Sequence, residues 1–253
     1  DLRMSRGLGD VYKRQVEERT VQQLLHLQQK RFGNENVLTV AMPCQSNKED
    51  LEDAKLVSET FGVKLLEINL TDTYEKLEDE INYVLKEDLS QESKINIKPR
   101  LRMTTLYGVA QTYNYLVMGT GNLCEIMVGY TTKWGDSASD INPIANFTVE
   151  EVIKIGKILG VPESIIEKNP SDGLSGKSDE EKMGVTYKEI AEYIENGKTE
   201  STKMKKIENM YMKSKHKREK IPTYIVNRKN YLKERNKSVS YTHLRAHETC
   251  ADL

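Results

Sequence analysis

The chain has 253 residues, of which 37% are hydrophobic and 30% are charged, and its formal net charge is −1 at pH 7. This length and composition suit one globular domain with a substantial core, and the small net charge excludes a protein steered globally toward nucleic acid or a membrane surface. No apolar run is long enough to cross a bilayer, and the 3 cysteines have no paired spacing. We therefore expect reduced thiols, no metal site built from cysteine, and a cytoplasmic location.

The two ends of the chain are related at the level of DNA. Residues 6–15 (RGLGDVYKRQ) and 238–248 (SVSYTHLRAHE) can be encoded by complementary strands of one sequence, which looks like a transposon adapter from a sequencing library. We therefore expect residues 1–15 and 238–253 to be adapter-derived and to lie outside the fold, and residues 16–237 to form one domain.

Helical and strand-like patterns alternate between these ends. Helices are indicated by apolar residues at helical spacing with glycine at the end, and strands by short apolar runs. The first elements predicted in chain order are a helix over 16–32, a strand over 37–42, a helix over 51–61, a strand over 64–70 and a helix over 71–85. The polar residues 88–98 predict a linker. This alternation predicts an α/β fold with a Rossmann-like, doubly wound parallel sheet and helices on both faces.

Residues 96–107 (NIKPRLRMTTLY) predict a helix that begins after Pro99 and carries Arg100 in its first turn. A guanidinium group presents a planar fork of donors that suits a phosphate or a carboxylate. The alternative is an arginine that is simply solvated at the start of a helix.

Residues 115–143 (YLVMGTGNLCEIMVGYTTKWGDSASDINP) hold the densest set of polar candidates. The apolar run 115–118 predicts a buried strand, and the glycines after it let backbone amides approach a phosphate closely. Ligands of open α/β sheets bind beyond such strand ends. Glu125 can hold a divalent cation, and Lys133 can neutralise a carboxylate or phosphate. The alternative is a strand, a turn and a solvated loop; we expect Trp134 to be a packing residue.

The last third of the chain predicts three helices and one long loop. Thr148 and Glu151 form a capping box that begins a helix ending at Gly160. Residues 168–184 are polar and glycine-rich, which predicts either a lid or a surface loop. Helices follow over 187–195 and 202–220; the second is basic, but no aromatic platform accompanies its charge, so we expect no nucleic-acid partner.

The pattern GTGNxxExxVGYxTKxGDxxxDxxP within residues 119–143 closely resembles the signature of NAD synthetases, which are ATP-dependent amide ligases of the adenine-nucleotide α-hydrolase group. Residues 96–107 resemble a second family segment, and residues 168–184 resemble the family's mobile loop. His216-Lys217-Arg218, followed by Pro222, resembles the family's C-terminal HKR…P segment. The resemblance covers about residues 20–222.

The resemblance implies amidation of deamido-NAD with free ammonia and ATP through an adenylated carboxylate, which gives NAD, AMP and pyrophosphate. It also implies Mg²⁺, a homodimer, and no membrane or nucleic-acid partner. The residue roles it implies are ATP contacts by Thr120 and Ser171, magnesium binding by Glu125, deamido-NAD contacts by Arg100, Lys133, Asp140, His216 and Lys217, and catalysis by Lys133, Asp136 and Asp140. Which aspartate handles ammonia is open.

Two departures from the family pattern bear on activity. The family's SGGxDS loop, which cradles the ATP pyrophosphate, has no counterpart, because the corresponding place reads KRQVEERT. Val149 stands where many relatives carry a lysine directed at ATP. We therefore expect the sheet to lack its first strand and the chain as given to be inactive or nearly so. The alternatives are a non-catalytic nucleotide-binding module, which both departures favour, and another adenylating ligase of the same fold.

Overall fold

The computed structural model describes residues 10–12, 33–46, 48–159, 161, 178–198 and 200–223. The chain divides into two units, Asp1–Arg218 and Glu219–Leu253. In the second unit, the described residues 219–223 contain neither helix nor strand. The predicted helix over 16–32 and Ser171 lie outside the described residues.

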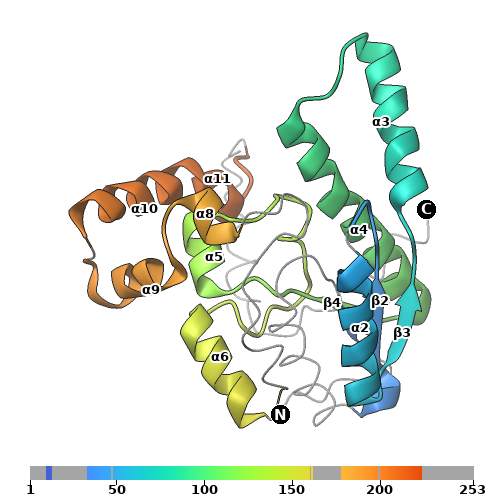
Figure 1. Cartoon of the computed structure of the whole chain (residues 1–253), viewed down its shortest axis with the longest axis horizontal. Coiled ribbons are helices and arrows are strands. Elements are labelled where there is room, and N and C mark those ends of the chain that lie inside the picture. Colours follow the sequence, from blue (N-terminus) through green and yellow to red (C-terminus); the bar gives the residue numbers. More distant parts are fainter. Residues whose placement is uncertain are drawn as a thin grey trace, which may run out of the picture. The chain divides into compact units, whose positions relative to one another are not determined.

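The first unit is built on a parallel sheet with the strand order β3-β2-β1-β4 (Figure 1). Its strands are β1 (Asp10–Tyr12), β2 (Val37–Ala41), β3 (Lys64–Glu67) and β4 (Leu116–Met118). A parallel bridge between Met118 and Ile141 extends the pairing beyond β4. This order, in which the chain works outward from a central strand in both directions, is typical of doubly wound α/β folds. The predicted fold class is confirmed.

The expectation that the sheet lacks its central strand is wrong. Asp10–Tyr12 lies between β2 and β4 and pairs in parallel with both, with Val11 opposite Leu38 on one side and Val117 on the other. The physical reason is that buried strands need partners for their backbone N–H and C=O groups. A gap between β2 and β4 would leave two inner edges unpaired, and the extended segment Asp-Val-Tyr fills it.

Alternate residues of β2 point into two separate cores. Val37 packs with Val57 of α2 (Lys48–Phe61) and Val152 of α6 (Val149–Ile158) on one face. On the other face, Leu38 and Val40 pack against α3 (Thr71–Leu85) and α4 (Gln91–Tyr113). A strand covered on both faces reads as a continuous apolar run because no side faces water, which is why VLTVA was recognisable in the sequence.

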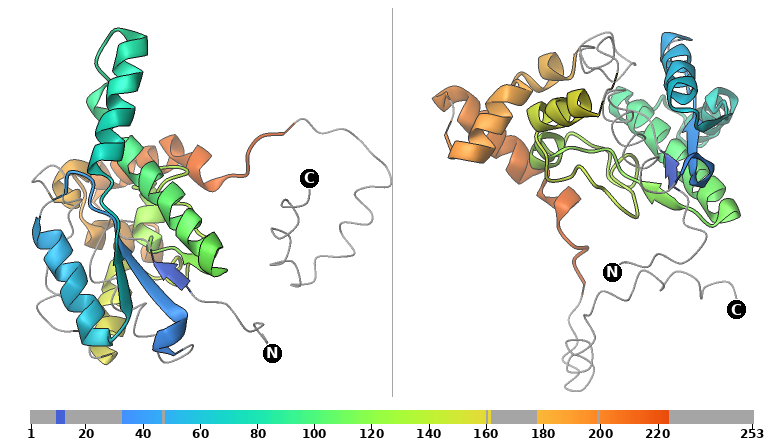
Figure 2. Two further views of the ribbon diagram at one scale, coloured as in Figure 1. Left: turned by 90° about the vertical axis from the view of Figure 1, so that its right-hand side faces the viewer. Right: turned by 90° about the horizontal axis from the view of Figure 1, so that it is seen from below.

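The predicted linker over 88–98 and the predicted helix start after Pro99 are wrong. Helix α4 begins at Gln91, where the Ser90 side chain caps it by accepting a hydrogen bond from the Ser93 amide. Pro99 lies inside the helix and is buried. The Ser90 cap gives the first turn of α4 a hydrogen-bond acceptor that it would otherwise lack. Packing of Leu106 and Ala110 on the sheet offsets the loss of the backbone hydrogen bond that Pro99 cannot donate. Figure 2 shows α3 and the beginning of α4 as a hairpin that projects beyond the sheet.

A third core is formed by residues of α5 (Leu123–Val128), α8 (Asp179–Met183), α9 (Tyr187–Asn196) and α10 (Ser201–Lys213). Helix α11 (Lys215–Arg218) follows α10 and contributes no buried residue. A short 3-10 helix, η1 (Asn34–Asn36), precedes β2. The core joins Cys124 and Val128 of α5 to Ile190 of α9 and Ile207 of α10, and the last two are fully buried. No helix in the described part of the chain is long and apolar enough to span a membrane.

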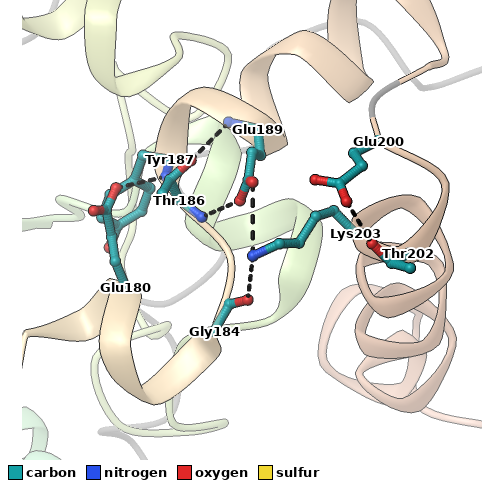
Figure 3. Close-up of polar contacts among 8 residues, drawn as sticks. All are labelled: Glu180, Gly184, Thr186, Tyr187, Glu189, Glu200, Thr202 and Lys203. Atoms are coloured by element: carbon teal, nitrogen blue, oxygen red, sulfur yellow. Dashed lines mark hydrogen bonds and ion pairs between the residues drawn. The ribbon is translucent and has the colours of Figure 1, made fainter.

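Polar contacts fix the α8–α9 connection against α10 (Figure 3). Thr186 and Glu189 form the capping box that begins α9. Lys203 of α10 lies 3.7 Å from the Glu189 carboxylate and donates to the Gly184 carbonyl at 3.2 Å. One lysine therefore ties α10 both to the start of α9 and to the end of α8.

Truncation of the core tests this packing. Leu106 is fully buried between α4 and the sheet, so Leu106→Ala is expected to lower the free energy of unfolding by about 2–5 kcal/mol. Urea unfolding followed by circular dichroism measures the change. Leu85→Ala removes a side chain that is 52% exposed and should change stability by less than about 0.5 kcal/mol; equal losses in the two variants would contradict the described core.

Candidate active site

The junction between β4 and α5 places the glycine turn at the carboxyl end of the sheet. A Cβ atom at Gly119 would lie 2.5 Å from the Ser139 hydroxyl oxygen, so only glycine fits. The Gly119 amide donates to the Ile141 carbonyl at 2.6 Å. That amide is therefore engaged at the edge of the sheet. Thr120 follows, half-buried, between the strand and the helix.

Glu125 is buried in the capping box of α5. Its Oε2 atom accepts from the Asn122 amide at 2.9 Å, and the Asn122 Oδ1 atom accepts from the Glu125 amide at 3.1 Å. The two side chains are 3% and 1% exposed. The Asn122 Nδ2 donor is buried without a hydrogen-bond partner. Buried amide donors normally have a hydrogen-bond partner. The Asn122 side chain therefore offers an unused donor close to Thr120 and Glu125.

The Asp140 carboxylate is held by the protein through both oxygens. The Val117 amide donates to Oδ2 at 2.7 Å, and the Tyr107 hydroxyl donates to Oδ1 at 3.3 Å. The Asp140 amide donates in turn to the Val117 carbonyl at 2.8 Å. Asp140 therefore continues the backbone pairing of β4 on the side where the described residues supply no neighbouring strand.

Burial and the Asp140 carboxylate act together on Tyr107. Burial first, and the negative charge and hydrogen bond of Asp140 next, raise the pKa of Tyr107 to about 12. Each of these effects disfavours the phenolate. Tyr107 lies within the segment that resembles the family, but nothing in the sequence paired it with an aspartate 33 residues away.

A tight turn over residues 132–137 presents Trp134 to solvent. The Thr132 amide donates to Asp136 Oδ1 at 2.7 Å, and the Gly135 amide donates to the Thr132 carbonyl at 2.9 Å. Trp134 has φ 60° and is 54% exposed. The expectation of a packed tryptophan is wrong, because the turn directs the indole outward. The ring instead lies 5.5 Å from the Lys133 ammonium.

Three predicted substrate-binding residues meet beside this turn. The Lys133 ammonium donates to the His216 carbonyl at 2.6 Å, and Arg100 Nε donates to the Lys133 carbonyl at 3.3 Å. Arg100 comes from α4, Lys133 from the loop after α5, and His216 from α11. Two cationic groups and a histidine are thus brought together from segments that are far apart in the chain.

The end of α5 is held by α11, which lies beside it in Figure 1. The Lys217 ammonium donates to the carbonyls of Gly129 and Thr131 at 2.7 and 2.6 Å. Arg218 donates to the carbonyls of Ile126 and Met127, both at 3.1 Å. These cations add side-chain donors to carbonyls at and just after the end of α5, where the helix dipole favours positive charge.

Close packing and burial accompany these bonds. Gly129 has φ 68°, and a Cβ atom there would lie 2.0 Å from the Ser214 Cβ atom, so glycine lets the start of α11 approach. Burial lowers the pKa of Lys217, while the negative charges of Asp136 and Glu92 oppose that shift. The ammonium has three donors, of which the two carbonyls take two.

The predicted residues therefore fall into three places. Arg100, Lys133 and His216 meet directly, with Asp136 and Lys217 in the adjoining loop and helix. Thr120 and Glu125 lie at the β4–α5 junction, and Asp140 lies at the sheet edge. Ser171 lies outside the described residues. Val149 is buried in the third core, at 7% exposure, where an apolar side chain is suited.

The sequence did not indicate Tyr107, Asn122 or the capping role of Arg218. In the described part of the chain, no group of three or more histidine, cysteine or acidic side chains could hold a metal ion together. A magnesium ion needs fewer protein ligands, because it commonly keeps waters and binds one or two carboxylates together with substrate phosphates. A single carboxylate such as Glu125 is compatible with that arrangement.

Comparison with known proteins places this geometry in context. The family model described as NAD synthase matches residues 21–221. The NH(3)-dependent NAD(+) synthetase of Carboxydothermus hydrogenoformans is 43% identical over 189 residues, which span 74% of this chain and 77% of that protein. The NMN synthetase structure from Francisella tularensis has TM-score 0.80 at 31% identity and covers 87% of this chain and 91% of its own. An NH3-dependent NAD synthetase from Campylobacter jejuni shares the fold, with TM-score 0.70, 24% identity and coverage of 88% and 91%.

Removal of the Arg218 guanidinium tests the attachment of α11 to α5. Arg218→Met leaves the Ile126 and Met127 carbonyls without this donor, so we expect the free energy of unfolding to fall by about 1–3 kcal/mol. Chemical unfolding monitored by circular dichroism measures the loss. The matched control is Lys205→Met, which removes an exposed cation from α10. If both variants lose the same stability, the attachment contributes nothing.

The pH dependence of stability tests the Tyr107–Asp140 contact. Burial, with the Asp140 carboxylate, raises the pKa of the Tyr107 phenol from its ordinary 10.0 to about 12 in the fold. The folded state therefore keeps its proton longer, and this stabilisation is complete below pH 10 and is lost as pH rises from 10 toward 12. Tyr107→Phe should remove that part of the alkaline loss. In an absorbance titration of tyrosinate, the Tyr107→Phe curve should lack one tyrosine that ionises well above pH 10. If the two curves differ only near pH 10, the pKa of Tyr107 is not raised by the fold.

Proposed function

Because the chain belongs to the NAD synthase family, we propose that it amidates deamido-NAD with ammonia and ATP, which yields NAD, AMP and pyrophosphate. The observation that carries the proposal is the meeting of Arg100, Lys133 and His216 across contacts of 3.3 and 2.6 Å. Fixed cationic groups of this kind suit a substrate that bears both a pyrophosphate and a carboxylate.

The chemistry requires an activated carboxylate. A free nicotinate carboxylate resists ammonia because oxide would have to leave. In the proposed first step, its oxygen attacks the α-phosphorus of ATP and pyrophosphate departs, so that an acyl adenylate forms. Ammonia then attacks the carbonyl carbon, loses a proton, and releases AMP. Both steps depend on positioning and charge neutralisation rather than on an enzyme nucleophile.

The residues divide this work by their places in the fold. Lys133 neutralises and orients the nicotinate carboxylate, Arg100 and His216 contact the dinucleotide, and Lys217 fixes the loop that carries Lys133. Thr120 lies just beyond the carboxyl end of β4, which is where the phosphates of ATP would bind in an open α/β sheet. We also propose that the Ser171 hydroxyl contacts ATP, because Ser171 stands in the segment that resembles the family's mobile loop.

Glu125 is the residue that would hold magnesium, whose charge would neutralise the ATP phosphates when bound. The buried Asn122 amide donor beside it suits an anionic group at the same place. For ammonium, Asp136 is favoured over Asp140. Both oxygens of Asp140 accept hydrogen bonds from the protein, whereas the Thr132 amide occupies one oxygen of Asp136.

A homodimer is part of the proposal. The α3–α4 hairpin exposes Tyr83 and Val84 at 82% and 73%, and neighbouring apolar side chains in solvent are typical of a surface that meets a partner. Size-exclusion chromatography with light scattering would test whether a second copy covers them. The location is proposed to be cytoplasmic.

A second candidate differs only in the size of the substrate. The similarity to an NMN synthetase structure at 31% identity favours amidation of the mononucleotide. We prefer the dinucleotide because the relative at 43% identity is an NH(3)-dependent NAD(+) synthetase. Rates measured with deamido-NAD and with nicotinate mononucleotide separate the two.

The decisive experiment measures NAD and AMP formation from deamido-NAD, ATP, Mg²⁺ and an ammonium salt. It uses the chain as given beside a chain supplied with an SGGxDS loop ahead of residue 20. We expect equimolar products from the second chain and little from the first, since the first has no loop of this kind for the pyrophosphate. If the loop-bearing chain folds but forms no product, the synthetase proposal fails.

In the loop-bearing chain, Lys133→Met is expected to lower kcat/KM for deamido-NAD by about 100-fold or more, because a charge aimed at the reacting carboxylate is lost. Lys205→Met removes a lysine remote from the site and should leave kcat/KM unchanged. Initial rates of AMP release measure both. Similar rates for the two variants would remove Lys133 from the mechanism.

A further inference from the structure

Trp134 stands out because its backbone and its side chain are both in unfavourable settings. Its φ of 60° lies in the left-handed region, which bulky residues rarely adopt. Its indole is 54% exposed although burial of a tryptophan would stabilise the fold. Strained residues persist where the surrounding structure determines them, and they cluster at functional sites.

The surroundings of Trp134 determine its conformation in detail. The bonds from the Thr132 amide to Asp136 and from the Gly135 amide to the Thr132 carbonyl close the turn on both sides. The Thr132 hydroxyl donates to Asn96 Oδ1 at 2.8 Å, which anchors the turn to α4. A Cβ atom at Gly135 would lie 3.1 Å from the Pro99 Cβ atom. The indole is therefore displayed by a rigid turn packed against a helix.

The chemical setting of the indole suits one kind of ligand. The Lys133 ammonium lies 5.5 Å from the ring centroid, and Lys133 itself joins Arg100 to His216. The nicotinate end of deamido-NAD is a flat pyridinium ring that carries a carboxylate. An electron-poor cationic ring stacks favourably on an electron-rich indole, while its carboxylate pairs with the adjacent ammonium.

We propose that Trp134 is a positioning residue whose indole stacks on the nicotinate ring and holds its carboxylate at Lys133. This inference rests on the proposed function and names the group that receives the reacting end of its substrate. The rigid turn orders the platform before binding, so that less conformational freedom is lost when the ring stacks.

Trp134 is the only tryptophan in the chain, so intrinsic fluorescence reports on this residue alone. Deamido-NAD and nicotinate mononucleotide should quench the emission saturably, whereas AMP, the other half of the dinucleotide, should not. Calorimetry measures deamido-NAD binding independently. If deamido-NAD binds by calorimetry without changing the emission, the inference fails and the proposed function stands. Quenching by AMP but not by nicotinate mononucleotide would assign the indole to adenine and overturn the proposal.

Two substitutions give the energetic test. Trp134→Ala should weaken deamido-NAD binding about 5- to 150-fold, the range expected when an aromatic stacking partner is removed. Trp134→Phe keeps a stacking face and should stay close to the parent. Because the parent's fluorescence needs no variant, the test holds even if Trp134→Ala fails to fold. Unchanged affinity in a folded Trp134→Ala protein would overturn the inference, and a parent that does not bind deamido-NAD at all would sink the proposed function with it.

Discussion

The candidate site depends on the attachment of α11 to the far end of α5. The Lys217 and Arg218 side chains donate to carbonyls that lie 86 to 92 residues earlier in the chain. These bonds place two positive charges at the C-terminal end of α5, where the helix dipole favours them. The same attachment brings the His216 carbonyl within 2.6 Å of the Lys133 ammonium. A stabilising contact at a helix end thus sets the position of the proposed substrate-binding lysine.

The turn over residues 132–137, which follows α5, carries Lys133 and Trp134 next to this attachment. It is closed by Asp136 and anchored through Thr132 to Asn96 of α4. Helix α4 also supplies Arg100 to the Lys133 carbonyl. Two helices from different parts of the chain therefore hold one turn, and rigidity of that kind suits groups that must meet a reacting carboxylate at defined positions. Asp140 has a structural role instead, because its carboxylate accepts hydrogen bonds from the Val117 amide at the edge of the sheet and from the Tyr107 hydroxyl.

Much of the fold could be predicted from local pattern. The alternation of helices and strands predicted the doubly wound sheet, and α3 was predicted with its observed bounds, Thr71–Leu85. The start of α4 was missed because Pro99 suggested a boundary, while the Ser90 cap and the packing of the helix on the sheet outweigh it. The central strand was missed because Asp10–Tyr12 looks foreign in sequence. Strand pairing is a non-local property, and three residues satisfy it when both neighbours offer open edges.

The sequence by itself determined the family, the α/β class and the kinds of chemical group available, because motif spacing and hydrophobic period are local properties of the chain. Only the tertiary structure decided what those groups face. It buried Glu125 in a capping box, engaged both oxygens of Asp140, and turned Trp134 outward beside Lys133. The physical reason is that hydrogen-bond partners and burial come from segments far apart in the chain, so the same carboxylate or indole can serve packing, pairing or binding until the fold sets its neighbours.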